Sequence, residues 1–467
     1  MNEINKKNTS RREFLKNTGR LAATSAVVAG IVRPGYAAES NTISIALIGC
    51  GGRGASAVKN AFSVTNGPIK LVAMGDVFEN RLKGSYKDLS EKSADLMDVP
   101  EDRRFVGLDA YKKAMDCLRP GDVAIFTTPP AFRWVHFTYA IEKGLNVFME
   151  KPVTVDGPTS RRMFDLAKKA DAKNLKVGVG LMSRHQRALQ QLQKRIQDGE
   201  IGDIILQRGY RMQGPIGTFS SPPKPPNISD LMYQIQRFHS FLWAGGGCFS
   251  DFLIHIIDHQ CWMKNAWPIK AQGVGGRHYR RDPKGVRYVD QNFDSYSVEY
   301  TFADGSKFFM EGRCISGCSE FYSSAAHGSK GLAIVSKQGD CGMPSSTYKG
   351  QNPDRANMIW ESTVDPDESN PYKNEWNELI DAIRSDKPYN ETERGVRASL
   401  VTSMGRMAAH TGQEITYEKI LNSDHEMAPG LDKLTKDSPA PLKPDSEGRY
   451  PVPQPGIVKD REYKDFE

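Results

Sequence analysis

Three side chains in two segments of this sequence could together move a proton. Lys151 follows Glu150 at the end of the apolar run 146–149 and precedes Pro152, so its ammonium can point into a cleft and stabilise a developing alkoxide during hydride transfer. Asp251 and His255 are four residues apart in a stretch that predicts a helix, which places them on one helix face. There the carboxylate can orient the imidazole, and His255 becomes a candidate general base. Taken singly, the lysine could be an exposed loop charge and the pair a polar helix surface.

The histidines and cysteines do not predict a metal centre. Asp251, His255 and His259 follow one another at four-residue spacing and could bind a metal, but no fourth ligand is evident. The seven cysteines have neither a dense disulfide pattern nor the paired spacing of a zinc site. They are Cys50, Cys117, Cys248, Cys261, Cys314, Cys318 and Cys341. We therefore expect no metal, and free thiols that are mostly buried.

A glycine-rich turn predicts a nucleotide-binding site. Gly49, Gly51 and Gly54 fit the pattern G-x-G-x-x-G, after the apolar run 43–48 and before a helical stretch. The first glycine allows a tight turn, the second lets the backbone approach a pyrophosphate, and the third permits close packing of helix on strand. The free N–H groups of the helix, which we expect to begin near Ala55, would face the phosphates. A purely structural turn between strand and helix is the alternative.

Asp76 indicates which dinucleotide such a turn would take. It ends the second predicted strand, about 20 residues after the glycine turn. A carboxylate in this place accepts hydrogen bonds from the ribose hydroxyls and repels a 2′-phosphate. NAD is therefore favoured over NADP.

The elements that must hold these residues follow two patterns. From residue 43 to about 181, short β-rich runs alternate with helical ones, which predicts a Rossmann-type, doubly wound parallel sheet. After about residue 202 strands predominate, which predicts an α+β domain built on an open, mostly antiparallel sheet. We expect a leader over 1–38, an NAD-binding Rossmann domain over 40–160, a substrate and oligomerisation domain over 161–365, helices that return to the Rossmann domain over 366–422, and a Pro-rich tail over 423–467. Such a tail would wrap the surface or a neighbouring subunit, or be disordered.

The first 38 residues predict a twin-arginine export signal. Residues 9–16, Thr-Ser-Arg-Arg-Glu-Phe-Leu-Lys, precede a mildly apolar run at 21–32 that is shorter than the roughly 20 residues needed to span a bilayer. A chance Arg-Arg pair is the alternative. The leader holds seven Lys or Arg and two acids, and therefore five of the seven net positive charges of the chain. The export signal predicts a periplasmic protein. Because the remainder of the chain has no dense basic patch, we expect that it neither binds nucleic acid nor inserts into a membrane.

Three motifs occur in the order Gly49-Cys50-Gly51-Gly52-Arg53-Gly54, Glu150-Lys151-Pro152 and Gly245-Gly246-Gly247 followed by Asp251 and His255. In this order they resemble the glucose–fructose oxidoreductase, inositol dehydrogenase and MocA (Gfo/Idh/MocA) family, over about residues 43–417. The resemblance implies a Rossmann domain, an open sheet whose free face makes oligomer contacts in a dimer or tetramer, and redox chemistry at a sugar or cyclitol hydroxyl. It also implies that Lys151, Asp251 and His255 are the catalytic residues. The Pro-rich insertion before Phe241 and the tail are less typical of the family.

Further residues complete the expected site. At the cofactor we expect Gly49, Cys50, Gly51, Gly52, Arg53, Gly54, Asp76, Thr128, Pro129, His136, Glu150 and Lys151. Toward the substrate we expect Arg184, His185, Arg237, Trp243 and His259, with His239 in the same segment. Trp243 could stack on a sugar face, and His136 is interpreted as a supporting residue. Each substrate-side residue could instead belong to the packing or the rim.

Together these features predict an NAD(P)-dependent oxidoreductase that acts on a secondary hydroxyl of a sugar, glycoside or cyclitol. An exported protein has no access to cytosolic recycling of its nucleotide, so we expect the cofactor to be tightly bound. One alternative is a redox-neutral cycle, in which transient oxidation of a sugar carbon acidifies its neighbour, permits elimination of the glycosidic bond, and is then reversed. Another is a non-catalytic sugar-binding protein with a vestigial cofactor site.

Overall fold

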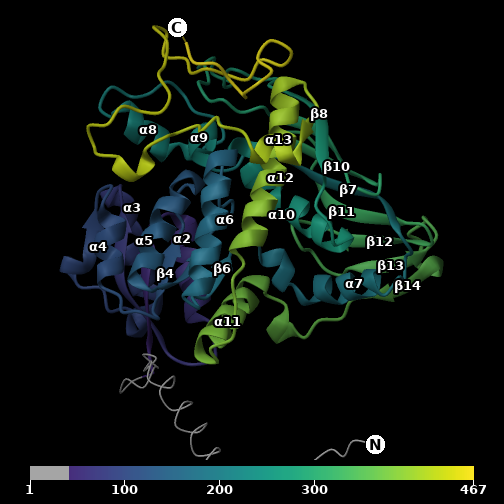
Figure 1. Ribbon diagram of the computed structural model, residues 1–467, viewed down its shortest axis with the longest axis horizontal. Helices are drawn as coiled ribbons and strands as arrows, with labels where there is room; N and C mark the ends of the chain where they lie inside the picture. Colours follow the sequence, from purple (N-terminus) through teal and green to yellow (C-terminus); the bar gives the residue numbers. More distant parts are fainter. Residues whose placement is uncertain (1–40, 467) are drawn as a thin grey trace, which may run out of the picture. The chain divides into compact units, whose positions relative to one another are not determined.

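The computed structural model describes residues 41–466, so the predicted leader lies outside the described residues. Within the described residues, 43–466 form one compact unit. Two β-sheets run through this unit, with helix α12 (Thr392–Thr411) between them (Figure 1). Because both sheets belong to a single compact unit, the predicted domain boundaries stay a prediction.

The first sheet has six parallel strands in the order β3-β2-β1-β4-β5-β6. Its strands are β1 (Ile43–Ile48), β2 (Ile69–Asp76), β3 (Arg104–Val106), β4 (Val123–Phe126), β5 (Asn146–Met149) and β6 (Val177–Val179). The helices that connect them are α2 (Gly52–Phe62), α3 (Glu79–Ser93), α4 (Ala110–Asp116), α5 (Arg133–Lys143) and α6 (Gly157–Ala172). The strand order reverses between β1 and β4, and in such sheets ligands bind beyond the carboxyl ends of the strands at this point.

The second sheet has nine strands in the order β14-β13-β12-β11-β7-β10-β9-β8-β15. They are β7 (Ile204–Gln213), β8 (Lys270–Gly276), β9 (Ser295–Thr301), β10 (Lys307–Cys314), β11 (Phe321–Gly328), β12 (Gly331–Ser336), β13 (Ser346–Lys349), β14 (Met358–Glu361) and β15 (Ile415–Thr416). Neighbours are antiparallel except β7 with β10. The predicted combination of a parallel and a mostly antiparallel sheet is confirmed.

Helix α10 (Gly247–Lys264) covers one face of the second sheet. Glycines in the sheet permit this close approach: a Cβ at Gly209 would lie 2.4 Å from Ile256, and one at Gly312 would lie 2.7 Å from Leu253.

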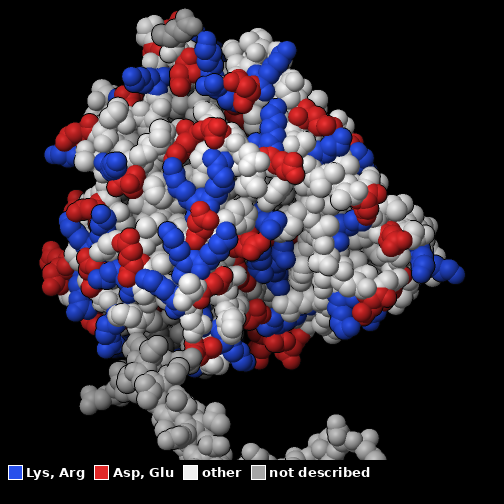
Figure 2. Space-filling model, viewed as in Figure 1, with Lys and Arg blue, Asp and Glu red and all other residues white. Residues whose placement is uncertain are grey.

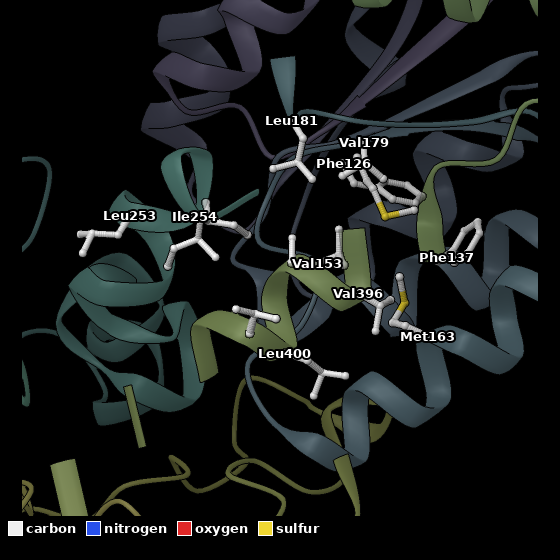
Figure 3. Packing of buried hydrophobic residues seen from close by; sticks show 14 of the residues in the cluster. Phe126, Phe137, Val153, Met163, Val179, Leu181, Leu253, Ile254, Val396 and Leu400 are labelled. Atoms are coloured by element: carbon white, nitrogen blue, oxygen red, sulfur yellow. The ribbon is translucent and has the colours of Figure 1, made fainter. Parts of the chain in front are cut away.

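One hydrophobic core joins the two halves (Figure 3). Val153 and Leu181 from the first half pack in the same cluster as Val396 on α12 and Leu253 on α10. Helix α11 (Pro371–Arg384) packs on α2 and β6. Such a shared core fixes the position of α10 relative to the strand end that carries Lys151.

The Pro-rich tail wraps the surface of its own chain (Figure 1). Glu426 pairs with Arg162 at 2.5 and 2.8 Å, and Glu462 is buried against Arg406 at 2.7 Å. Between these two anchors the tail passes the short helices α8 (Asp230–Gln236) and α9 (Leu242–Gly245). Buried apolar tail side chains secure it there, namely Met427, Leu431, Leu442, Tyr450 and Tyr463.

Charges of both signs alternate over the face of the molecule that Figure 2 shows. In the described part of the chain, no helix combines the length and apolar composition needed to cross a membrane.

Candidate active site

The three glycines of the turn have different surroundings: two are enclosed by backbone atoms, and one faces a cavity. Gly49 has φ +98°, and a Cβ there would lie 2.7 Å from the backbone nitrogen of Thr128. A Cβ at Gly54 would lie 2.1 Å from the carbonyl oxygen of Gly49, whereas one at Gly51 would meet nothing within 4 Å. Helix α2 begins at Gly52, slightly earlier than the predicted start near Ala55. The open space at Gly51, in front of a helix N-terminus, fits a pyrophosphate.

A cavity of about 620 Å³ lies over this turn. The predicted cofactor residues that line it are Gly49, Cys50, Gly51, Gly52, Arg53, Gly54, Asp76, Thr128, Pro129 and His136. Glu150 and Lys151 are not among its lining residues in the described chain. Its size and glycine floor fit a dinucleotide.

Asp76 stands at the end of β2 as predicted and is largely buried. Its carboxylate accepts hydrogen bonds from the backbone nitrogen of Cys50 at 2.6 Å and from that of Phe78 at 2.8 Å. Burial raises the pKa of Asp76, which these N–H donors partly offset. Burial and the Asp76 charge raise the pKa of the Cys50 thiol well above its ordinary value, so the thiol stays protonated.

Two further cofactor candidates are tied to neighbouring groups. Arg53 donates from Nε to Glu150 at 2.7 Å and lies 4.9 Å over the ring of Tyr372. His136 lies with its Nδ1 3.2 Å from the hydroxyl of Thr128. Burial, aided by the positive charge of a neighbouring arginine, lowers the pKa of His136 to about 3, so its ring is neutral. These contacts suit residues that shape the wall of the cavity.

Lys151 and Asp251 come together as the motif order predicts. Lys151 Nζ donates to the carbonyl oxygen of Asp251 at 2.6 Å and lies 3.4 Å from Oδ1 of the same residue. Asp251 sits in the first turns of α10, where the shared core holds it over the end of β5. An ammonium next to a carboxylate beside a cofactor cavity can polarise a substrate oxygen.

His255 is also buried, but its predicted hydrogen bond with Asp251 is not formed. The second carboxylate oxygen of Asp251 lies 3.5 Å from Nε2 of His239 instead. Among the described residues, Nδ1 of His255 has no hydrogen-bond partner. Burial and the charges of Lys151 and Arg211 hold the pKa of His255 well below its ordinary value, so the imidazole is neutral. Helix spacing correctly placed Asp251 and His255 on α10, but the neighbours of the Asp251 carboxylate are Lys151 and His239 from other segments.

Arg184 and His185 are bound to acids away from the cofactor cavity. Arg184 forms a bidentate pair with Asp258, at 2.7 and 2.9 Å, and lines a separate cavity of about 350 Å³. His185 lies 2.7 Å from Glu378 and 3.3 Å from Glu391. Burial alone would lower the pKa of His185, but these carboxylates raise it to about 9. Within the described chain, Arg184 and His185 are therefore not among the residues that line the cofactor cavity.

The remaining substrate candidates also have structural partners. Arg237 donates to the hydroxyl of Ser221 at 2.7 Å. Trp243 is fully buried, and its indole nitrogen donates to a glutamine side chain, so no ring face is open for a sugar. His259 is fully buried with its Nε2 2.8 Å from the hydroxyl of Ser324. Trp243 and His259 thus belong to the packing, the alternative that the sequence left open.

Two groups of residues at the site carried no sequence signal. Arg211 on β7 and Asp340 in the β12–β13 loop lie 3.6 Å apart, and both act electrostatically on the group around Lys151. The tail contributes three residues to the cavity wall, namely Leu431, Asp432 and Leu434.

No group of three or more His, Cys, Asp or Glu side chains within residues 41–466 could hold a metal ion. The seven cysteines are free, as predicted, and four of them are buried.

No protein-family model matches the chain. Part of the chain is similar to an inositol 2-dehydrogenase of Corynebacterium glutamicum, with 26% identity over 196 residues that cover 39% of this chain and 55% of the relative. A second part-length match is a scyllo-inositol 2-dehydrogenase (NAD(+)) of Bacillus subtilis, 28% identical over 237 residues that cover 50% of this chain and 57% of the relative. The chain thus spans about half the length of the curated relatives it matches.

Among solved structures, a levoglucosan dehydrogenase in complex with NADH and levoglucosan matches with a TM-score of 0.61 at 15% identity. The match covers 80% of this chain and 99% of that one, and at this identity it concerns the fold. It confirms the two-domain fold class. The homologues of this chain are inositol dehydrogenases and related oxidoreductases of the Gfo/Idh/MocA type.

Proposed function

We propose that this protein is an NAD-dependent oxidoreductase that acts on a secondary hydroxyl of a sugar, glycoside or cyclitol. One observation carries the proposal: the cavity over the glycine turn reaches His239, which lies 3.5 Å from the Asp251 carboxylate that holds Lys151. A nucleotide-sized space therefore adjoins an ammonium–carboxylate pair and a neutral histidine. The cyclitol dehydrogenases among the relatives support a cyclic polyol as substrate.

The side chains around Lys151 have distinct parts in such a reaction. A bound nicotinamide supplies the acceptor for the hydride of the carbon that carries the hydroxyl. Lys151 donates a hydrogen bond to the substrate oxygen and stabilises its growing negative charge. His255 takes the hydroxyl proton, because its neutral ring has one nitrogen with a free lone pair. Asp251 keeps the ammonium of Lys151 in place.

Asp76 supports NAD as the cofactor. Its carboxylate lines the cavity at the end of β2, where it would accept from ribose hydroxyls and oppose a 2′-phosphate. The Bacillus subtilis relative is named for NAD(+), and the matching solved structure holds NADH.

The same proposal includes a cofactor that stays with the protein through export by the twin-arginine route to the periplasm. The motif at residues 9–16 supports export. The tail supports retention, because Leu431 and Leu434 line the cavity while Glu462 is anchored in the core.

A retained cofactor also favours a second candidate function, the redox-neutral cleavage of a glycoside, which needs no cytosolic recycling of the nucleotide. Net formation of a keto-sugar would identify the dehydrogenase, and free sugar without net NADH would identify the cleavage cycle.

We further propose a homo-oligomer, a dimer or tetramer, that assembles through the second sheet. Val274 on β8 and Phe321 on β11, on the face away from α10, are 70% and 50% exposed. Light scattering should give a mass above that of one chain, which Val274→Asp with Phe321→Asp should reduce. A monomeric wild type would contradict this proposal.

The substitution Lys151→Ala tests the proposed active site. Loss of a donor to a developing oxyanion typically costs about 100- to 1,000-fold in turnover, and we expect this loss with inositols and simple sugars followed by NADH absorbance. Bound nucleotide should be unchanged, since Lys151 does not line the cavity within the described chain. A variant that keeps full turnover would refute the assignment.

A further inference from the structure

Asp251 has partners on two sides, and the second of them joins the cofactor cavity to the Lys151 pair. Lys151 Nζ lies 3.4 Å from Oδ1, and His239 Nε2 lies 3.5 Å from Oδ2. Only His239 of these two partners is among the residues that line the cavity, as far as the structure describes the chain. We propose that His239 is a positioning residue of the active site, which holds the Asp251 carboxylate toward Lys151. The inference rests on the proposed oxidoreductase function.

The hydrogen bonds of His239 assign its tautomer. The backbone N–H of Thr218 donates to Nδ1 at 3.2 Å, and the hydroxyl of Thr218 lies 3.0 Å from the same atom. Because Nδ1 accepts a hydrogen bond from an N–H group, the ring proton of the neutral imidazole is on Nε2. Nε2–H is therefore the ring group that faces Asp251, with Nε2 3.5 Å from Oδ2. With its protonated nitrogen on this side, the ring does not compete with His255 for the role of base.

The surrounding residues hold this ring in one orientation. The ring of Phe238 lies 3.8 Å away and that of Phe252 5.9 Å away, centre to centre. Gly217 has φ +56°, and a Cβ there would lie 2.7 Å from Cε1 of His239, so the loop is shaped around the imidazole. The side chain is only 18% exposed. Such packing pre-organises the donor, as a residue that must orient a catalytic carboxylate requires.

Two fixed partners give Asp251 one geometry. Without His239, the carboxylate would be free to rotate about its side-chain bonds. Lys151 would keep its 2.6 Å hydrogen bond to the carbonyl oxygen of Asp251 but would lose the fixed carboxylate oxygen at 3.4 Å. Since a displacement of about 1 Å can cost about 100-fold in rate, we expect the loss in kcat rather than in the KM for the sugar or cyclitol.

The test compares His239→Phe, which keeps a planar ring without a donor, with His239→Gln, which keeps an N–H donor. We expect His239→Phe to lower kcat by about 10- to 100-fold with the KM for the sugar or cyclitol nearly unchanged, and His239→Gln to recover most of the loss. The matched control is His278→Phe, because His278 also contacts an aspartate, Asp294 at 2.9 Å, but is 60% exposed and outside the cavity lining. It should leave kcat unchanged.

A measurement without turnover tests the same contact. In the ¹⁵N spectrum of histidine-labelled protein, assigned with His239→Gln, His239 should carry its proton on Nε2, and Asp251→Asn should shift that resonance. A proton on Nδ1, unchanged kcat in His239→Phe, or equal losses in the Phe and Gln variants would overturn the inference. If wild-type protein oxidises no cyclitol or sugar, the proposed function fails, while the ¹⁵N data still decide the His239–Asp251 contact.

Discussion

Replacing Glu462 by glutamine should loosen the tail and release the cofactor. Glu462 is buried, accepts from Nη2 of Arg406 at 2.7 Å, and lies 2.7 Å from Nδ1 of His410. Burial alone would raise the pKa of this carboxyl, but Arg406 and His410 lower it from 4.5 to about 2. At about 1.36 kcal/mol per pH unit, this difference corresponds to about 3 kcal/mol. That is close to the roughly 3–5 kcal/mol lost when one partner of a buried pair is removed.

The assay has two readouts, urea unfolding followed by circular dichroism and the rate at which bound nucleotide is released. We expect Glu462→Gln to lower the free energy of unfolding by about 3 kcal/mol and to speed release, because the tail then leaves the wall at Leu431 and Leu434. The control is Glu447→Gln, since Glu447 is an exposed tail residue paired with Arg287. It should change neither readout.

The pH dependence of this effect has a definite sign. The pKa of Glu462 in the folded protein is below its ordinary value, so its stabilisation is present above about pH 4.5 and is lost as the pH falls toward 2. The stability difference between wild type and Glu462→Gln should therefore be complete at neutral pH and shrink below pH 4.5. Equal stability at neutral pH, with unchanged nucleotide release, would refute the role given to the tail.

Two further predictions concern the glycine turn and a buried histidine. Gly54→Ala should unfold the turn, because its methyl would meet the Gly49 carbonyl oxygen at 2.1 Å, whereas Gly51→Ala should fold normally and bind nucleotide weakly, as thermal melts and nucleotide titration can show. If both variants fold and bind alike, the division of roles in the turn is wrong. The pKa of His185 is raised to about 9 by Glu391 and Glu378 against the effect of burial, so its stabilisation is present below its ordinary value of 6.5 and lost as the pH rises through 9. Urea titrations of His185→Gln should show a deficit that shrinks over this interval, and a constant deficit would contradict the ion pairs.

Much of the first sheet could be predicted because its strands are short apolar runs between helical segments. Strand β11 (Phe321–Gly328) is hard to predict from the sequence, since its serines and alanines give little β signal and its place comes from pairing with β7. Helix α3 (Glu79–Ser93) is also hard to predict because it is mostly polar, with only Leu82, Ser85 and Leu89 buried. In both elements, tertiary contacts outweigh local composition.

The candidate site was predictable in its composition and less so in its contacts. Helix spacing put Asp251 and His255 on one face, but could not show that Lys151 and His239 would reach the carboxylate from distant segments. Trp243 looked available to a sugar because nothing in its neighbourhood indicated that it would be enclosed. The tail has few apolar residues, yet those few are placed to anchor it, which composition alone does not reveal.

The most direct test of the account is mass analysis of the small molecules released when the purified, exported protein is denatured. Export with a retained cofactor predicts close to one NAD per chain, in oxidised or reduced form, that survives extensive dialysis. Glu462→Gln, purified in parallel, should carry less. Exported protein that releases no nucleotide, while binding sugars normally, would contradict the central claim and favour a sugar-binding protein instead.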